Sequence, residues 1–415
     1  MSNLEELIQE LCPIGVSHKP LGNLGIFYSG LNGKSKDDFM YGNAKFISYM
    51  NIFSNISVNI DAFDTVKIGE DERQNTVKYG DILFTGSSET PDECGLSSVL
   101  TKHTDEKLYL NSFCFGYRFH DADLMLPSFA KYLFRSESLR KQIKKTASGV
   151  TRFNVSKKKM ENVIIPLPPL PVQREIVRIL DNFTELTAEL TAELTARQKQ
   201  FAYYREKILD EACVDADMIT MSELGEWSGG KTPSMAEHSY WDNGTIPWIS
   251  SKDMKSSMLS DTQDHITDVA IKEASMTLYP ANSIVMVTRS GILKHTFPVA
   301  FVPFETTINQ DIKILVTRKG VLPRYAFHAI QGKGQDILIK TKKQGGTVDS
   351  LEFQKVLNYK IPLPSLNEQS RIVSILDRFD ALCNDLASGL PAEIAARQKQ
   401  YEYYRDKLLT FKEKV

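Results

Sequence analysis

The stretch IPLPPLPVQREIVRILDNFTEL, which begins at Ile165, returns in the same chain as IPLPSLNEQSRIVSILDRFDAL from Ile361. A second pair follows: ARQKQFAYYREKIL from Ala196 and ARQKQYEYYRDKLL from Ala396. The separation of the copies along the sequence is far too long for a solenoid repeat, so it indicates a tandem duplication of one domain together with one helix. We therefore expect a pseudo-twofold molecule.

Each repeated stretch has the apolar spacing of a long helix. Steps of three, four or seven residues place the apolar side chains on one face, and a proline-rich hinge precedes each stretch. Two such helices predict an antiparallel coiled coil. Gly389 and Pro391 should kink or break the second helix. The residues expected to pair the helices are Ile176, Leu180, Phe183, Leu186, Leu190, Leu194, Ile372, Leu376, Phe379, Leu382 and Leu386.

The segments upstream of the helices have a mixed pattern. Short β-type runs such as DILFT from Asp81 and IKILV from Ile312 alternate with turn residues, and a helical pattern covers 128–145. The expected fold class is two tandemly duplicated α/β (α+β) domains separated by the long helices. The predicted boundaries are 1–163 for the first domain, 164–210 for the hinge and central helix, 211–360 for the second domain, and 361–415 for the second hinge and C-terminal helix.

The composition is that of a globular protein. The chain has 415 residues, is 42% hydrophobic and 25% charged, and carries a formal net charge of -2. Its N-terminus is acidic and no apolar run reaches the length of a membrane span, which argues against export and membrane insertion. The cysteines form no CxxC pair, as is typical of reduced thiols. These features predict a cytoplasmic protein.

Basic residues concentrate locally although the net charge is close to zero. Every charged residue from 139 to 159 is Lys or Arg, and lysines also gather in the corresponding stretch from 333 to 355. A single basic run is often only a solvated surface, but recurrence in both copies favours contact with phosphates.

With these motifs, the whole chain resembles the DNA-specificity subunit (HsdS) of type I restriction-modification enzymes. The resemblance rests on both proline-led helices, on the TELTAELTAELT run from Thr184, and on two matching segments upstream of the hinges. Those segments are ASGVTRFNVSKKKMENV from Ala147 and KQGGTVDSLEFQKVLNY from Lys343.

The resemblance implies two target-recognition domains, each reading one part of a split, asymmetric sequence in double-stranded DNA. It also implies that the helices set the spacing between the two parts and dock two methyltransferase subunits, through which restriction subunits join. Catalysis would then belong to the partners, because a methylated base must be flipped into their active site. The sequence itself contains no methyl-donor motif and no metal-binding spacing, so we expect no catalytic residue, cofactor or metal in this chain.

The candidate DNA contacts are polar residues near predicted strand ends, because such side chains reach base edges or phosphates. They are Tyr28, Thr85, Ser87, Lys144, Lys145, Thr151 and Arg152 in the first domain, and Lys231, Thr232, Ser250, Lys252, Arg289, Ser290, Lys342, Lys343 and Gln344 in the second.

Two other functions stay open from the sequence. The segment GEWSGGKT, from Gly225 to Thr232, satisfies the phosphate-loop pattern of an NTPase. Such a loop needs a helix that starts at its Lys-Thr, yet Pro233 follows at once, so a turn near DNA is the preferred interpretation. The other alternative is a coiled-coil adaptor that binds protein alone.

Overall fold

A computed structural model describes residues 3–212, 216–343, 348–384 and 389–414. The chain divides into two compact units. Unit 1 contains residues 1–188 and 396–415, and unit 2 contains residues 189–395. Each unit therefore combines one mixed domain with parts of the long helices, and each is described by itself.

The main sheet of unit 1 has the strand order β2-β9-β5-β7, with all neighbours antiparallel. A smaller sheet has the order β4-β3-β8, in which β3 is antiparallel to β4 and parallel to β8. The strands of these sheets are β2 (Gly25–Ser29), β3 (Ala44–Ile47), β4 (Asp64–Val66), β5 (Ile82–Thr85), β7 (Ser97–Val99), β8 (Leu108–Leu110) and β9 (Cys114–Phe119).

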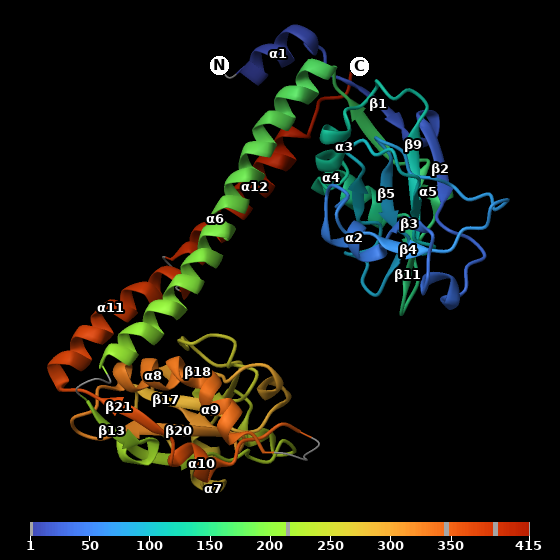
Figure 1. The fold of residues 1–415 in the computed structure, drawn as a ribbon. Helices are drawn as coiled ribbons and strands as arrows, with labels where there is room; N and C mark the ends of the chain where they lie inside the picture. Colours follow the sequence, from blue (N-terminus) through green and yellow to red (C-terminus); the bar gives the residue numbers. More distant parts are fainter. Residues whose placement is uncertain (1–2, 213–215, 344–347, 385–388, 415) are drawn as a thin grey trace. The chain divides into compact units, whose positions relative to one another are not determined.

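Strand β5 is buried along its whole length because it is apolar on both faces, as expected of a central strand. Its Phe84 packs against Phe115 and Phe134, with 5.2 and 5.7 Å between ring centroids. Helices α3 and α4 lie beside this sheet (Figure 1). Further elements of unit 1 are α1 (Asn3–Leu11), β1 (Ser17–Pro20), α2 (Tyr49–Ser54), β6 (Ser87–Ser88), α3 (Pro127–Leu133), α4 (Glu137–Lys144), β10 (Ala147–Ser148), β11 (Phe153–Val155), α5 (Lys157–Met160) and β12 (Ile164–Leu167).

Unit 2 repeats the topology of these two sheets, while the β10-β11-β6 sheet of unit 1 corresponds only to isolated bridges in unit 2. Its main sheet has the order β14-β20-β17-β18, its smaller sheet the order β16-β15-β19 with β15 and β19 parallel, and β13 pairs with β21 as β1 pairs with β12. The duplication seen in the sequence is therefore also a duplication of fold. The strands are β13 (Asp217–Thr220), β14 (Gly225–Gly229), β15 (Ile246–Ile249), β16 (Asp264–Ile266), β17 (Ser283–Val287), β18 (Val299–Val302), β19 (Thr307–Ile308), β20 (Ile312–Thr317) and β21 (Lys360–Leu363).

Short helices complete unit 2. Helix α8 packs on strands β17 and β18 of the main sheet, in the place that α3 takes in unit 1. The helices are α7 (Asp268–Glu273), α8 (Pro323–Gly332), α9 (Gly334–Thr341) and α10 (Phe353–Leu357).

The long helices are α6 (Leu170–Ala212), α11 (Leu366–Asn384) and α12 (Leu390–Leu408). The second copy is thus described as two helices, one on each side of residues 385–388, which lie outside the described residues. Gly389 and Pro391 fall at the start of α12, where a proline is tolerated because its missing N–H would have no helical partner.

Helix pairing is antiparallel and is visible within each unit. In unit 2 the ring of Phe201 stacks on Phe379 at 6.1 Å, and Glu211, later in α6, interacts with Arg371, earlier in α11. In unit 1 Phe183 of α6 stacks on Tyr404 of α12, with 5.4 Å between ring centroids.

The residues expected to pair the helices are placed unevenly. Most are buried or half-buried, but many of their contacts are with the adjacent domain: Ile176 and Leu180 belong to the core of unit 1, and Ile372 and Leu376 to that of unit 2. Leu186 is 37% exposed and Leu382 is 39% exposed, so each buries only part of its side chain. Leu386 lies outside the described residues.

A buried glutamine fixes each long helix to its domain. The amide oxygen of Gln173 accepts a 2.8 Å hydrogen bond from the Leu126 N–H at the start of α3, and its Nε2 donates to the carbonyls of Leu124 and Pro168. Gln369 repeats the arrangement: it accepts from the Leu322 N–H at 2.9 Å and donates to Gly320 and Pro364. Both amides are almost fully buried, so the angle between helix and domain is set by satisfied polar groups.

Candidate nucleic-acid interface

Three segments of unit 1 meet at one corner of the domain. These are residues 48–50 at the start of α2, 86–88 around β6, and 111–113 before β9, and together we call them the first corner. The Asn111 N–H donates to the Ile47 carbonyl at 3.0 Å, and the Phe113 N–H donates to Oδ1 of Asn111 at 2.9 Å. The Gly86 N–H donates to the Phe113 carbonyl at 2.8 Å. Backbone hydrogen bonds therefore hold the three segments in a fixed relation.

The large exposed side chains of the first corner are apolar, whereas its serines at 87 and 88 are buried. Met50 is 59% exposed and Phe113 is 61% exposed. They line a groove of about 310 Å³ that also includes Tyr49, Ser87 and Arg152. The guanidinium of Arg152 lies over the Phe113 ring, 5.8 Å from its centroid. The groove thus combines apolar surface and one cation with the carboxylates of Glu89 and Glu93, and its aromatic rings are of the kind on which nucleic-acid bases can stack.

Unit 2 builds a second corner on the same backbone hydrogen bonds. The Asn309 N–H donates to the Ile249 carbonyl at 2.9 Å, and the Asp311 N–H donates to Oδ1 of Asn309 at 3.0 Å. The Thr288 N–H donates to the Asp311 carbonyl at 2.8 Å. We define the second corner as residues 250–252, 288–290 and 309–311.

The side chains of the second corner are polar and charged. Nε of Arg289 lies 3.7 Å from a carboxylate oxygen of Asp311, and Lys252 lies 3.7 Å from Asp264. These ion pairs are loose and largely solvent-exposed, so they contribute little stability and leave the cations able to take another partner. Nearby, Lys342 pairs with Asp349 at 2.8 Å.

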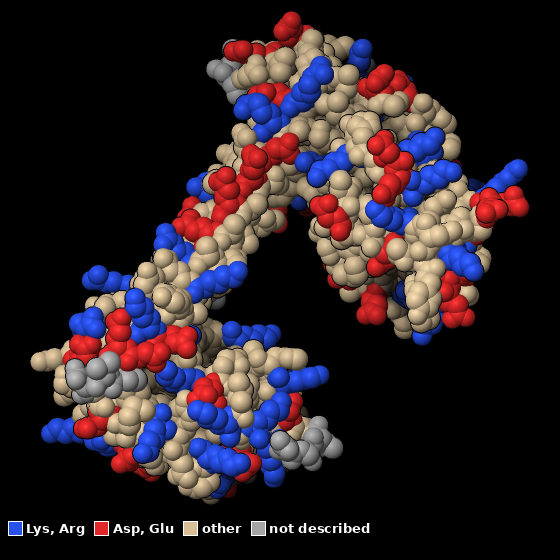
Figure 2. All heavy atoms as spheres, viewed as in Figure 1, with Lys and Arg blue, Asp and Glu red and all other residues tan. Residues whose placement is uncertain are grey.

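Surface charge is mixed in both units. Figure 2 shows Lys and Arg side chains interspersed with Asp and Glu on the visible faces, with no single basic field covering either unit. The net charge of -2 agrees with this picture. Contact with phosphates would therefore depend on a few placed cations rather than on the overall field.

Two of the predicted DNA contacts in the first domain are buried. Tyr28 is buried, donates a 2.6 Å hydrogen bond to Asp81, and has a raised pKa because of burial and of that carboxylate. Thr85 is fully buried in β5, where its hydroxyl accepts a 2.9 Å hydrogen bond from the Leu96 N–H. Their polar groups are satisfied inside the core, so neither side chain can reach DNA without unfolding part of the domain.

The other candidates of the first domain are at or near the surface. Ser87 is mostly buried at the edge of the groove, and Lys144 forms an ion pair with Asp92. The exposed candidates are Lys145, Thr151 and Arg152, of which Arg152 lines the groove.

Arg140 belongs to the same basic run but is structural. Its guanidinium is buried and donates to the carbonyls of Cys94 and Asp92 at 2.7 and 2.9 Å. Burial lowers the pKa of this guanidinium.

In the second domain, three candidates have structural partners. Ser250 is buried at the turn after β15, where its N–H donates to Asp253 at 2.8 Å. The Thr232 hydroxyl donates to Gln310, and the Lys231 ammonium donates to the Ser275 carbonyl at 3.3 Å.

The remaining candidates of the second domain flank or form the second corner. Lys252, Arg289 and Ser290 belong to it. Arg289 forms an isolated β-bridge with Ser350, and Lys342 forms one with the next residue, Leu351. Lys343 is exposed, and Gln344 lies outside the described residues.

Met50, Phe113 and Asp311 are corner residues that the sequence reasoning missed. A signal for them exists in the chain: FISYMN from Phe46 and WISSKD from Trp248 hold the same strand-to-turn position in the two domains. Aligning the two copies over this segment would have marked Met50 and Lys252 as matched turn positions.

The phosphate-loop pattern does not form a phosphate loop. Residues 225–229 are strand β14, and the chain after Gly230 is irregular: the Lys231 N–H donates to the Ile308 carbonyl, and no helix begins at Lys231 or Thr232. The converging N–H groups and helix dipole that bind phosphate are therefore missing from this part of the described chain.

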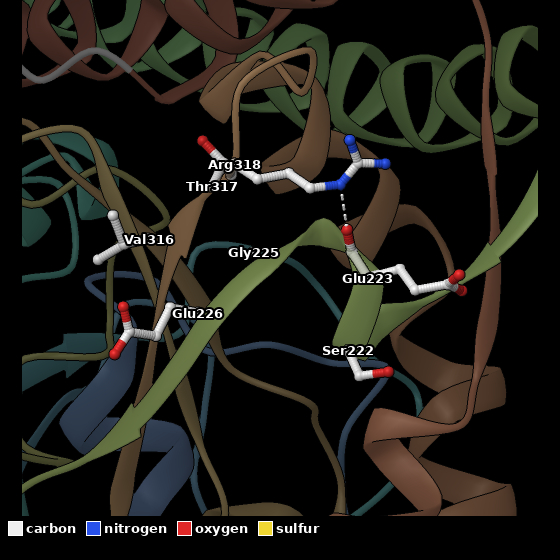
Figure 3. Close-up of a pocket in the computed structure, with 7 residues that line it drawn as sticks. All are labelled: Ser222, Glu223, Gly225, Glu226, Val316, Thr317 and Arg318. Atoms are coloured by element: carbon white, nitrogen blue, oxygen red, sulfur yellow. Dashed lines mark hydrogen bonds between the residues drawn. The ribbon is translucent and has the colours of Figure 1, made fainter.

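The shallow pocket at the start of the same segment is also unsuited to an anion. Figure 3 shows the carboxylates of Glu223 and Glu226 and the guanidinium of Arg318 around Gly225. Nε of Arg318 is already engaged, since it donates to the Glu223 carbonyl at 2.5 Å. Two carboxylates beside one engaged cation disfavour bound phosphate.

The comparisons with known proteins agree with the duplicated fold. The family model described as the type I restriction modification DNA specificity domain matches residues 18–197 and again residues 214–396. The chain belongs to this family. A type I restriction enzyme specificity subunit of Escherichia coli is 48% identical over 263 residues, which cover 62% of this chain and 64% of that relative, less than two thirds of its length.

Two further similarities extend this result. A putative type I restriction enzyme specificity subunit of Haemophilus influenzae is 35% identical over 64% of this chain and 68% of its own length. A chain from a structural study of complex assembly and conformational transition of the type I restriction-modification system has a TM-score of 0.65 at 17% identity, covering 95% of this chain and 97% of its own. At that identity the match shows a shared fold, and the family model shows that this chain is a type I specificity subunit.

The described residues contain neither a metal-binding cluster nor a membrane-spanning helix. No group of three or more His, Cys, Asp or Glu is arranged to hold a metal ion. No helix is both long enough and apolar enough to cross a membrane.

Proposed function

We propose that this specificity subunit reads a split, asymmetric DNA site, with each domain reading one half. One observation carries the proposal: the two corners share a backbone frame but carry different side chains. A shared frame suits docking on the same kind of duplex, and different side chains suit two different half-sites. In this role the chain works in the cytoplasm on double-stranded DNA.

The long helices are proposed to dock two methyltransferase subunits. Both copies present the same exposed row, Lys199, Tyr203 and Lys207 on α6 and Lys399, Tyr403 and Lys407 on α12. We call each row a helix stripe. Their spacing of four residues keeps each stripe on one helix face.

The helix stripes have no evident use in folding. Tyr203 is 61% exposed and Tyr403 is 63% exposed. The stripe positions are identical in the two copies, whereas neighbouring positions differ, as in the buried pair Phe201 and Tyr401 and the exposed pair Ala202 and Glu402. Exposed tyrosines are typical anchors of protein interfaces, so two identical stripes support two copies of one partner.

The subunit is proposed to be non-catalytic. Methyl transfer to a base requires a flipped nucleotide in a pocket with a methyl donor, and the methyltransferase subunits would supply that pocket. Restriction subunits would then associate through the methyltransferase complex. The spacing of the two half-sites is proposed to follow the length of the paired helices.

The test is to express the chain with its methyltransferase subunit in a host without other methylation and to sequence the modified DNA. The expected result is one motif with two unlike specified parts and a gap of fixed length. A continuous motif, a palindromic motif, or methylation unchanged by removal of this chain would contradict the proposal.

A further inference from the structure

We propose that the two corners read DNA by different chemistries and that their side chains determine the specificity of their half-sites. On this proposal Met50 and Phe113 contact thymine methyl groups, whereas Lys252, Arg289 and Asp311 form hydrogen bonds with the polar edges of G·C pairs. The inference rests on the proposed function and deepens it, because it names the reading residues and the class of base pair that each half-site contains.

The two corners are equivalent positions in the two units. Asn111 and Asn309 each bind the end of a parallel strand through their N–H and cap the next turn through Oδ1. Phe113 and Asp311 each accept a 2.8 Å hydrogen bond at their carbonyl, from Gly86 and from Thr288. The corresponding pairs of side chains are therefore Met50 with Lys252, Ser87 with Arg289, and Phe113 with Asp311.

Four of these six side chains, those of Met50, Phe113, Lys252 and Arg289, are exposed, and the fold does not require them. Neither Met50 nor Phe113 belongs to an apolar core cluster of the described residues, and more than half of each side chain is exposed to water. Arg289 and Lys252 make only loose ion pairs at 3.7 Å. The two corners share their backbone arrangement, but their exposed side chains are apolar in one and charged in the other. A surface that reads different DNA sequences requires this combination.

The chemistry of the major groove links each corner to a class of base pair. The thymine C5 methyl is the apolar feature that distinguishes base pairs there, and apolar side chains contact it. Arg and Lys donate to O6 and N7 of guanine, and Asp accepts from N4 of cytosine. The Arg289–Asp311 pair thus places a donor and an acceptor side by side, which matches the two bases of one G·C pair.

Arg152 is the cation of the first corner's groove. It lies over the Phe113 ring, and the matching position in unit 2 is Val348, which faces no such ring in the described residues. Because Glu89 and Glu93 line the same groove and disfavour a phosphate there, we assign Arg152 to holding Phe113 against the base edge through its contact with the ring.

The experiment exchanges the corners in the full complex of this chain with its methyltransferase subunit. The triple variant Met50→Lys, Ser87→Arg, Phe113→Asp carries the second corner's residues on the first frame. Sequencing of methylated DNA should show loss of the A·T positions in the first half-site, with the second half-site and the gap unchanged. The reciprocal variant Lys252→Met, Arg289→Ser, Asp311→Phe should alter only the second half-site.

A binding measurement tests the thymine contact directly. Replacing thymine by uracil in the first half-site should weaken binding of the wild-type complex about fourfold, the value of one buried methyl group. The substitutions Met50→Ala and Phe113→Ala, combined in one chain, should remove that difference. Because both side chains are exposed, the substitutions should leave the melting temperature unchanged. Ile26→Ala is the matched control, since Ile26 is exposed on β2 opposite Arg118, away from the corner.

The outcomes separate this inference from the proposed function. A wild-type motif that is bipartite, together with swapped variants that still methylate the same sequence, would overturn the inference alone. Loss of partner binding in the Phe113→Ala variant would also overturn it, because the corner would then be a protein contact. A wild-type complex without any bipartite motif would overturn the proposed function itself.

Discussion

Nε2 of His328 lies 2.7 Å from a carboxylate oxygen of Asp377, joining α8 to α11 inside unit 2. The imidazole is fully buried, and its Nδ1 has no hydrogen-bond partner among the described residues. Burial lowers the pKa of His328, and the nearby Arg324 opposes a second positive charge, although Asp377 and Asp380 favour one. Unit 1 has Tyr132 and Asp181 at the same places, with 2.6 Å between the hydroxyl and the carboxylate.

This difference predicts a pH dependence specific to His328. Because its pKa is lowered in the fold, the unfolded chain binds a proton more readily, so the free energy of unfolding should fall as pH drops below about 6.5. The variant His328→Tyr copies Tyr132 and should remove this loss, as measured by thermal unfolding between pH 7 and 5. Asp377 also has a lowered pKa, but its contribution is lost at lower pH, outside this window.

His295→Tyr is the control for that measurement. His295 is exposed, so its replacement should leave the pH dependence of the wild type in place. An equal loss of stability in His328→Tyr and in the wild type would show that His328 is not the group that titrates.

The buried glutamines predict equal effects in the two units. In Gln173→Leu the Leu126 N–H and two carbonyls lose their partner, and in Gln369→Leu the Leu322 N–H and two carbonyls do. Leaving such groups unsatisfied costs about 1–3 kcal/mol, which urea denaturation can measure. Gln354→Leu, at an exposed glutamine, should cost less than about 0.5 kcal/mol. Similar values for all three variants would mean that the glutamines do not anchor the helices.

The helix stripes predict a change in stoichiometry. Tyr403→Ala should reduce the number of bound methyltransferase subunits from two to one, and Tyr203→Ala combined with it should leave none, as measured by native mass spectrometry. Glu402→Ala is a matched control, because this exposed neighbour of Tyr403 corresponds to Ala202 in the other copy. Two bound subunits in the double variant would place the docking surface elsewhere.

The parts of the fold that could be predicted are those that the chain repeats. The apolar periodicity of α6, α11 and α12 predicts these helices without knowledge of their tertiary contacts. The sequence repeat also predicts a second domain like the first. The helical pattern over 128–145 was less informative. It is two helices, α3 and α4, because the chain turns at Ser136, whose hydroxyl donates to the Leu133 carbonyl.

The site was harder to predict because burial of a single side chain depends on distant partners. Tyr28 looked like a polar residue at a strand end, but Asp81 and Arg118 hold it inside the core. Phe113 begins the apolar run FCFGYRF, yet it stands before β9 and is exposed. Polar type alone therefore selected core residues and missed apolar surface ones.

The proposal that the helices set the gap between the half-sites leads to a mechanical prediction. Removing Thr187–Leu190 takes out about one helical turn, which keeps the apolar face of α6 in phase and shortens it by about 6 Å. At 3.4 Å per base pair, the gap in the methylated motif should shrink by about one or two base pairs while both half-sites stay the same.

A length-preserving variant separates helix length from side-chain chemistry in this test. Replacing Thr187, Glu189 and Leu190 by alanine keeps the residue count and favours helix, so the gap should equal that of the wild type. If the deletion leaves the gap unchanged, α6 does not act as the spacer. If the alanine variant changes it, side-chain contacts rather than helix length determine the spacing.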